Sequence, residues 1–273
     1  MSITLIGGRD FNLSIPSAAR SVVFTDVVAP EGVSLTNLAS DGSNYYVGWL
    51  DETTYYVSSQ VSGVKVFANS DSSYMFDAKS AIINFNNLDT SKVTNMNYMF
   101  RNATCETVNL SGLDVKNVTS MQNMFVSNAI KIIDISGWET NSNLMAYRMF
   151  ADCSNLTTIY ASENTEFLSG AFMFSNCSNL IGGNGTSYAS AGIKDQSYAR
   201  IDTDETPGYF TYKLNPNVKN MKMFVTKGTI NDIANAIRLK IGSNNMIAGN
   251  MLAEKILEIE TKNDLPKAEE VEF

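Results

Sequence analysis

Residues 89–100 read Asp-Thr-Ser-Lys-Val-Thr-Asn-Met-Asn-Tyr-Met-Phe, and residues 114–125 read Asp-Val-Lys-Asn-Val-Thr-Ser-Met-Gln-Asn-Met-Phe. The Met-Phe pair that closes this pattern occurs five times, at intervals of 24, 25, 25 and 24 residues. A constant period of this length is typical of repeat proteins whose units stack on one another. The five pairs are Met75 and Phe76, Met99 and Phe100, Met124 and Phe125, Met149 and Phe150, and Met173 and Phe174.

Each repeat carries two apolar patterns. Val93, Met96, Met99 and Phe100 are spaced i, i+3, i+6, i+7, which predicts one face of a short helical turn. A segment of alternating polar and apolar residues follows each Met-Phe pair and predicts a short strand. Together with the Met-Phe pairs, the first apolar column of these strands forms the expected repeat core: Ile83, Val108, Ile133 and Ile159.

Polar residues alternate with this apolar column. Asn84, Asn109, Asp134 and Tyr160 are expected to point outward and to form a possible ligand surface. Two plainer alternatives remain open: these side chains are merely solvated, or they are buried against a second protein.

Asn, Ser and Thr crowd the turns of the repeats, where their short side chains can bond neighbouring backbone groups. Asn102, Asn109, Asn117, Asn155 and Asn184 match the N-x-[ST] glycosylation pattern. Since we expect no signal peptide, we interpret these asparagines as corner residues.

The composition argues against catalysis and against nucleic acid. The 273 residues include 20 Lys and Arg, 28 Asp and Glu, and no His, for a net charge of −8. A negative chain attracts no phosphate backbone, and without imidazole there is no Ser-His or Cys-His couple and no His-ligated zinc site. We therefore expect no enzyme activity, no catalytic residues, no cofactor and no metal. The absence of a long apolar run predicts no membrane insertion.

The three cysteines lack the spacing of a metal or redox motif. Cys153 and Cys177 lie 24 residues apart, in the same phase of successive repeats. Either a disulfide or a ladder of free buried thiols would fit this placement, and the ladder is the favoured interpretation. Cys105 shares a column with Ile130 and Leu156 and is expected to replace leucine in the core.

The sequences at 89–100 and 113–125 resemble the BspA-like leucine-rich-repeat surface proteins, whose repeats read close to L-D-T-S-x-V-T-N-M-x-x-M-F. Asn143, Ala146 and Gly170 depart from that pattern. The stretch from Gly228 to Gly242 resembles a helical module of tail- and baseplate-associated proteins of phages that infect Gram-positive bacteria. The first resemblance implies an adhesion or protein-binding array, and the second implies a phage particle.

The expected fold class is a mixed β/α solenoid: a short, right-handed, leucine-rich-repeat-like array with a β-hairpin N-cap and a small C-terminal helical hairpin. The expected divisions, in chain order, are an attachment segment, a β cap, the repeats, a C-terminal cap, a linker, the helical hairpin and an acidic tail. They cover residues 1–42, 43–71, 72–183, 184–213, 214–228, 229–260 and 261–273.

The expected function is that of a phage virion protein, on the tail, the baseplate or another exposed surface, that presents the repeats for host-cell adhesion. Its expected partners are a host cell-surface protein or glycan and other virion proteins, bound through the N-terminal segment or the helical hairpin. Multiple copies, as a homo-oligomer or within the particle, would supply avidity. The alternatives are a purely structural or decorative virion protein, a bacterial BspA-like adhesin, and an intracellular scaffold.

Overall fold

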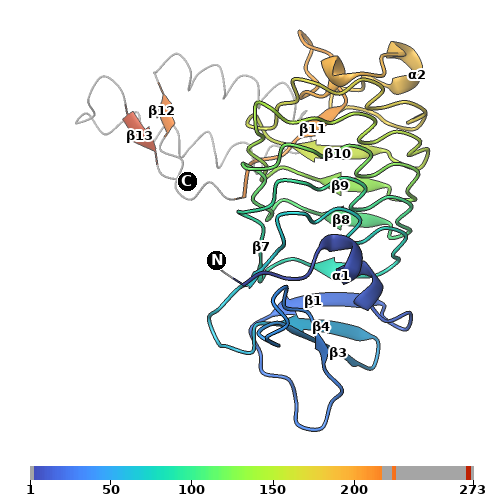
Figure 1. Cartoon of the computed structure of the whole chain (residues 1–273). Coiled ribbons are helices and arrows are strands. Elements are labelled where there is room, and N and C mark those ends of the chain that lie inside the picture. Colours follow the sequence, from blue (N-terminus) through green and yellow to red (C-terminus); the bar gives the residue numbers. More distant parts are fainter. Residues whose placement is uncertain (1–2, 217–222, 226–268, 272–273) are drawn as a thin grey trace, which may run out of the picture. The chain divides into compact units, whose positions relative to one another are not determined.

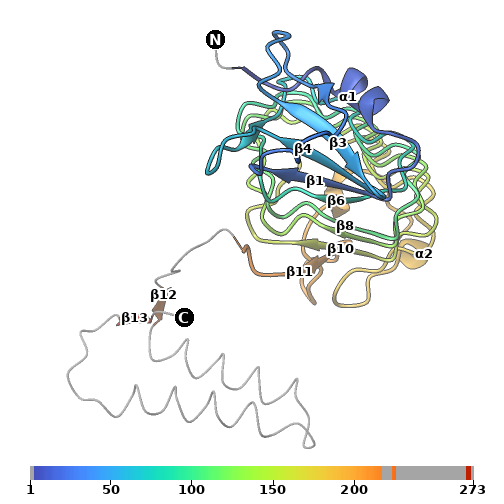
Figure 2. The same ribbon diagram turned by 90° about the horizontal axis from the view of Figure 1, so that it is seen from below.

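A computed structural model describes residues 3–216, 223–225 and 269–271, and the chain divides into two units, Met1–Asn217 and Val218–Phe273 (Figures 1 and 2). The elements in chain order are α1 Gly8–Ser14, β1 Ser21–Thr25, β2 Thr36–Asn37, β3 Val47–Asp51, β4 Thr54–Ser58, β5 Val66–Phe67, β6 Ile82–Asn84, β7 Leu88–Asp89, β8 Thr107–Asn109, β9 Ile132–Asp134, β10 Thr158–Ala161, α2 Tyr188–Ala191, the 3-10 turn η1 Gln196–Tyr198, β11 Phe210–Tyr212, β12 Met223–Val225 and β13 Glu269–Val271.

The strands of the repeats pair in parallel, one unit above the next (Figure 1). In the four-stranded sheet β11-β10-β9-β8, Val108 faces Ile133, Ile133 faces Ile159, and Ile159 faces Phe210. The first unit's strand, β6, belongs instead to a mixed five-stranded sheet of order β2-β3-β4-β1-β6. The repeated apolar column of the sequence therefore becomes a row of neighbouring strands.

The Met-Phe segments are turns, and the expected helices are absent from them. In each turn, the residue before the Met and the residue three positions after the Met adopt the left-handed backbone conformation. In the second unit these are Tyr98, with φ 57°, and Asn102, with φ 56°. A left-handed residue breaks an α-helix. The turns are held instead by the next unit, because the amides of Met96, Tyr98 and Phe100 donate to carbonyls 24 residues further along the chain.

The expected fold class, a mixed β/α solenoid with a right-handed leucine-rich-repeat-like array, is therefore wrong. The chain is mostly β, and its strands lie in several sheets, one of which is mixed. In the described residues, α1 and α2 span only seven and four residues, and neither belongs to a Met-Phe segment. The i, i+3 spacing reflects tight turns whose hydrogen bonds run between units.

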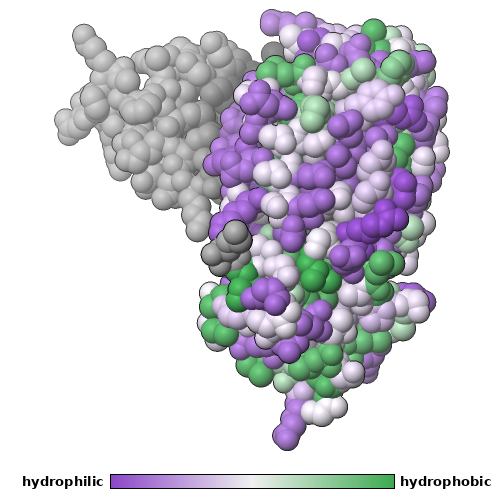
Figure 3. All heavy atoms as spheres, in the orientation of Figure 1, coloured by the Kyte–Doolittle hydropathy of each residue, from purple (hydrophilic) through white to green (hydrophobic). Residues whose placement is uncertain are grey.

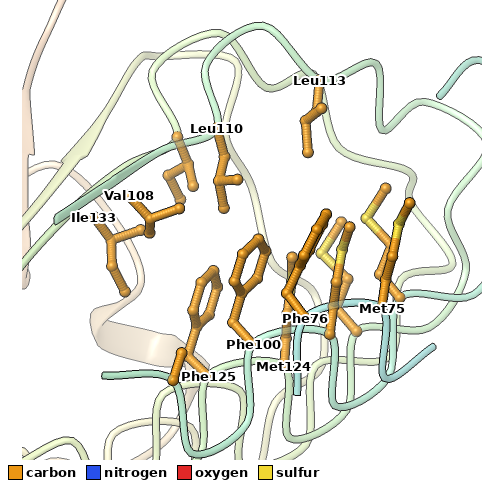
Figure 4. Close-up of a cluster of buried hydrophobic side chains, with 14 of the residues drawn as sticks. Met75, Phe76, Phe100, Val108, Leu110, Leu113, Met124, Phe125 and Ile133 are labelled. Atoms are coloured by element: carbon orange, nitrogen blue, oxygen red, sulfur yellow. The ribbon is translucent and has the colours of Figure 1, made fainter. Parts of the chain in front are cut away.

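The phenylalanines of the five Met-Phe pairs stack in a single file inside the molecule. Phe125 lies between Phe100 and Phe150, with ring centroids 5.5 Å and 5.3 Å away and rings nearly parallel. Figure 4 shows Phe76, Phe100 and Phe125 in a row opposite the strand residues Val108 and Ile133. This file and the strand column facing it form the continuous core of the repeats.

Helix α1 covers the first Met-Phe turn, whose carbonyls have no preceding repeat unit to bond. The Gly8 amide donates to the carbonyl of Asp71, and the Asn12 side chain donates to the carbonyls of Met75 and Asp77. Phe11 of α1 packs edge-on against the first ring of the file, Phe76. These contacts give the carbonyls of the first turn the hydrogen-bond donors that a preceding unit would supply.

Strand β1 lies beside β6, the strand of the first repeat unit. It pairs in parallel with β6 and, at its other edge, with β4 of the antiparallel β3–β4 hairpin. The sequence predicts that a hairpin seals this end of the repeats and that the N-terminal segment either caps the array or docks elsewhere. The N-terminal segment takes the capping role, because its strand β1 inserts between the hairpin and the first repeat strand.

The opposite end of the file meets aromatic residues from the segment after the repeats. Tyr209 and Phe210 pack edge-on against Phe174. The buried carboxylate of Asp202 orders this segment by accepting hydrogen bonds from the amides of Thr186 and Gly208, among others. Burial alone would raise the pKa of Asp202, but these hydrogen bonds outweigh it and lower that pKa.

The interpretation of Asn, Ser and Thr as corner residues is confirmed by their bonds between units. The Asn117 side chain donates to the carbonyl of Ser91, and that of Asn141 donates to the carbonyl of Lys116. The Thr119 hydroxyl donates to the carbonyl of Thr94 in the same manner.

In the second unit, β12 and β13 form a two-stranded antiparallel sheet. The helical hairpin expected over 229–260 lies outside the described residues, as do most of the expected linker and tail.

Candidate functional site

The row of paired repeat strands is interrupted once in the described part of the chain, between β6 and β8. A cleft of about 460 Å³ opens there. We name it the asparagine cleft. It is lined by Lys65, Ile83, Asn84, Phe85, Asn86, Leu88, Asn109, Ser111, Gly112 and Pro216.

Asn84 and Asn109 present amide donors in this cleft. The Oδ1 of Asn84 accepts a hydrogen bond from the backbone amide of Asn86, with an N–O distance of 3.0 Å. The Oδ1 of Asn109 accepts hydrogen bonds from the backbone amide and the side-chain hydroxyl of Ser111. These turns use the side-chain oxygens, and both asparagines are exposed residues. With the Lys65 ammonium, the cleft offers hydrogen-bond donors to an acceptor-rich ligand.

The other two residues of the expected ligand surface do not line the cleft. Asp134 is only 6% exposed, because its Oδ1 accepts from Ser136 and its Oδ2 pairs with the Lys213 ammonium. The same ammonium lies over the ring of Tyr160, 5.4 Å from its centroid. The segment after β11 thus covers Asp134 and Tyr160, and the structure brings only Asn84 and Asn109 together.

Seven of the lining residues are not predicted from the sequence as core or site residues: Lys65, Phe85, Asn86, Leu88, Ser111, Gly112 and Pro216. Asn86 shares a repeat column with Ser111 and Ser136, two positions after the strand asparagine or aspartate, so its signal was present in the alignment of the repeats. Lys65 and Pro216 come from segments on either side of the repeats, and no local pattern places them beside β6.

The expected repeat-core residues lie together in the interior. All ten side chains of the Met-Phe pairs are buried, as are Val108, Ile133 and Ile159. Ile83 is partly buried and packs against the same core, at the edge of the cleft. The face of the repeats visible in Figure 3 is mainly hydrophilic, and apolar residues gather towards the end that carries β1, β3 and β4.

Within the described ranges, no group of three or more Asp, Glu, His or Cys side chains is arranged to hold a metal ion. A search of the same residues finds no helix with the length and hydropathy needed to span a membrane.

Cys153 and Cys177 are free, buried thiols that form successive steps of a ladder. The Cys153 thiol donates to the carbonyl of Phe125, and the Cys177 thiol donates to that of Phe150. Burial raises the pKa of Cys153 to about 12 and also raises the pKa of Cys177. Neither group provides a reactive thiolate near neutral pH.

We expect iodoacetamide at pH 8 to leave Cys153 and Cys177 unmodified in the folded protein and to react slowly with the partly buried Cys105. Peptide mass spectrometry should locate any native adduct on Cys105, while the chain unfolded in guanidinium should carry three adducts. Equal labelling of the three cysteines in the folded chain, or a disulfide linking two of them, would contradict this arrangement.

No curated protein and no solved structure gives a significant match to this chain. The repeats match a family model. Residues 70–183 match the family described as "Mycoplasma protein of unknown function, DUF285", which is related to the BspA-like repeat proteins.

Proposed function

We propose that this chain is a non-enzymatic recognition protein on the exposed surface of a phage particle, and that it binds a host cell-surface glycan through the asparagine cleft. The observation that carries the proposal is the pair of exposed asparagines, Asn84 and Asn109, which line the cleft on either side of the gap between β6 and β8. Their turns engage the Oδ1 atoms, so the Nδ2 groups are the donors available to a ligand. Groups that accept hydrogen bonds, such as the acetamido carbonyl of an amino sugar, complement these donors.

A rigid frame supports recognition, because a preorganised site loses little conformational entropy when it binds. Asn84 and Asn109 are the last residues of β6 and β8, and the residues that follow them, Phe85 and Leu110, belong to the buried core. Many weak contacts, repeated over several copies in a particle, would add up to strong attachment.

The donors can be removed without removing the turns. Asp134 makes the same turn with a carboxylate oxygen, so Asn84→Asp and Asn109→Asp should keep their backbone bonds and lose both Nδ2 donors. The control is a double variant with the same charge change at exposed asparagines elsewhere in the repeats, Asn143→Asp and Asn155→Asp.

We expect the full chain to bind purified cell walls of the bacterium in which its gene resides. The Asn84→Asp, Asn109→Asp variant should bind at least about tenfold more weakly, because two hydrogen bonds are lost and a carboxylate repels acceptors. The control variant should bind like the wild type. Equal binding by all three proteins would contradict the proposal and favour a structural or decorative role.

The match to a family described from Mycoplasma favours a second candidate, a bacterial surface adhesin that uses the same cleft. Mass spectrometry of purified phage particles distinguishes the two. Recovery of the chain from particles supports the phage proposal, and recovery from the surface of uninfected cells alone supports the adhesin.

A further inference from the structure

The fourth and fifth repeat units carry large apolar side chains on the outer surface of their Met-Phe turns. The ring of Tyr147 meets the ring of Phe172 edge-on, with centroids 6.2 Å apart. Met145 lies two residues before Tyr147, and the residue between them is buried. Met145 also pairs in parallel with Ser169, the residue after Leu168. We name these side chains the turn patch: Met145, Tyr147, Leu168 and Phe172, which are 49%, 41%, 65% and 54% exposed.

The third unit makes the same turn with polar residues at these positions. Counted back from the Met of each pair, its residues are Ser120 for Met145, Gln122 for Tyr147, Thr119 for Leu168 and Asn123 for Phe172. The turn therefore does not require apolar side chains at its surface. Folding of the units leaves the turn patch unexplained, and a group of exposed apolar side chains is typical of an interaction surface.

The position of Phe172 shows the difference most clearly. In the first two units it is held by Tyr74 and Tyr98, which are only partly exposed, stack on each other and lie against the guanidinium of Arg101. Phe172 is more than half exposed and has φ 57°, a left-handed conformation that is unfavourable for a bulky side chain. An aromatic ring kept there at this cost is explained if a partner covers it.

The area of the turn patch matches the apolar part of a dimer interface. Side chains of this size each present about 150–250 Å² when fully exposed, so four that are about half exposed present about 400 Å². A standard interface buries about 800 Å² on each partner, of which about 450 Å² is apolar. The patch is thus large enough to form the centre of a contact between two folded chains.

The charged groups next to Tyr147 cancel each other. The Arg148 guanidinium pairs with the Asp152 carboxylate, which also accepts a hydrogen bond from the side chain of Asn176. A surface without net charge can meet an identical surface across a two-fold axis with no like charges in contact. The net charge of −8 on each chain opposes association at long range, so contact between two copies must rest on the apolar side chains.

We propose that the turn patch is the interface of a homodimer, in which the fourth and fifth units of two copies of this chain pack against each other across a two-fold axis. Figure 4 shows that the Met-Phe turns and the strand column lie on opposite sides of the repeat core. Contact through the turns therefore leaves Asn84 and Asn109 of both copies open to solvent. The inference does not depend on what the asparagine cleft binds.

The third unit supplies the variant that tests this interface. Tyr147→Gln combined with Phe172→Asn introduces the residues that the third unit has at the same positions, and Asn tolerates positive φ. The control is Leu13→Gln combined with Val28→Thr, which replaces two exposed apolar side chains of the N-terminal segment. Both variants should keep a Tm within a few degrees of that of the wild-type monomer.

Sedimentation equilibrium of the full chain, at concentrations up to millimolar, measures self-association. We expect the wild type and the control variant to form a dimer with a Kd in the micromolar range. The Tyr147→Gln, Phe172→Asn variant should associate at least about thirtyfold more weakly, because each lost side chain is lost from both copies. Sodium chloride should strengthen the dimer, because it screens the repulsion between two negative chains. At concentrations well below the Kd, the chain is a monomer in which Phe172 is exposed.

The proposal is overturned if the wild-type chain stays monomeric at millimolar concentration, or if the Tyr147→Gln, Phe172→Asn variant dimerises as tightly as the wild type. Equal loss of dimerisation in the control variant would also overturn it. The Asn84→Asp, Asn109→Asp variant should dimerise like the wild type, so the interface and the asparagine cleft can fail independently.

Discussion

Phe125→Ala is expected to lower the free energy of unfolding by about 3–5 kcal/mol, the largest effect we predict for a single side chain. Phe125 is fully buried, and its ring stacks on Phe100 and on Phe150. Truncation leaves a cavity in the middle of the file, and the neighbouring rings cannot close it without shifting the units that carry them. Urea denaturation followed by near-ultraviolet circular dichroism measures the change.

Phe172→Ala is the matched control, because Phe172 lies in a Met-Phe turn of the same repeat type but is 54% exposed. We expect it to change the free energy of unfolding by less than about 1 kcal/mol. Equal destabilisation by the two substitutions would show that the file of rings is not the core of the repeats.

Gly8→Ala is expected to lower the free energy of unfolding by about 2–3 kcal/mol. It disturbs the N-terminal end of the repeats, whereas Phe125→Ala disturbs their middle. A Cβ at Gly8 would lie 2.4 Å from the Ser73 carbonyl oxygen, so α1 must move away from the first turn. This displacement weakens the bond from Gly8 to Asp71 and the two bonds from Asn12. Thermal unfolding measures the loss.

Gly7→Ala provides the comparison, since nothing lies within 4 Å of a Cβ at Gly7. Its Tm should stay within a few degrees of the wild type. If Gly8→Ala were as stable as Gly7→Ala, close contact with α1 would not be what seals the first unit.

The period and the apolar columns of the repeats could be predicted because they are local and recur five times. The helical turns could not be predicted correctly, because residues spaced i, i+3 and i+7 also converge in a tight turn. Nothing in a single unit shows that Tyr98 and Asn102 adopt positive φ or that their amides bond the next unit. Bonds between units override local helix preference here.

The candidate site could be predicted in part. The alternation of polar and apolar residues in the strands predicts that Asn84 and Asn109 are exposed. The burial of Asp134 could not be predicted, because it depends on Lys213, which is 79 residues further along the chain. The parallel pairing of β1 with β6 is also remote in sequence, since it joins residues 61 apart such as Ser21 and Ile82.

Amide hydrogen exchange at Phe76, Phe100, Phe125 and Phe150 tests most directly whether the Met-Phe turns are bonded from one unit to the next. Each of these amides donates to a carbonyl of the following unit. We expect all four to exchange slowly and with similar free energies of opening, close to that of global unfolding. Rapid exchange at these positions, as in turns that bond only within themselves, would contradict the stacked arrangement.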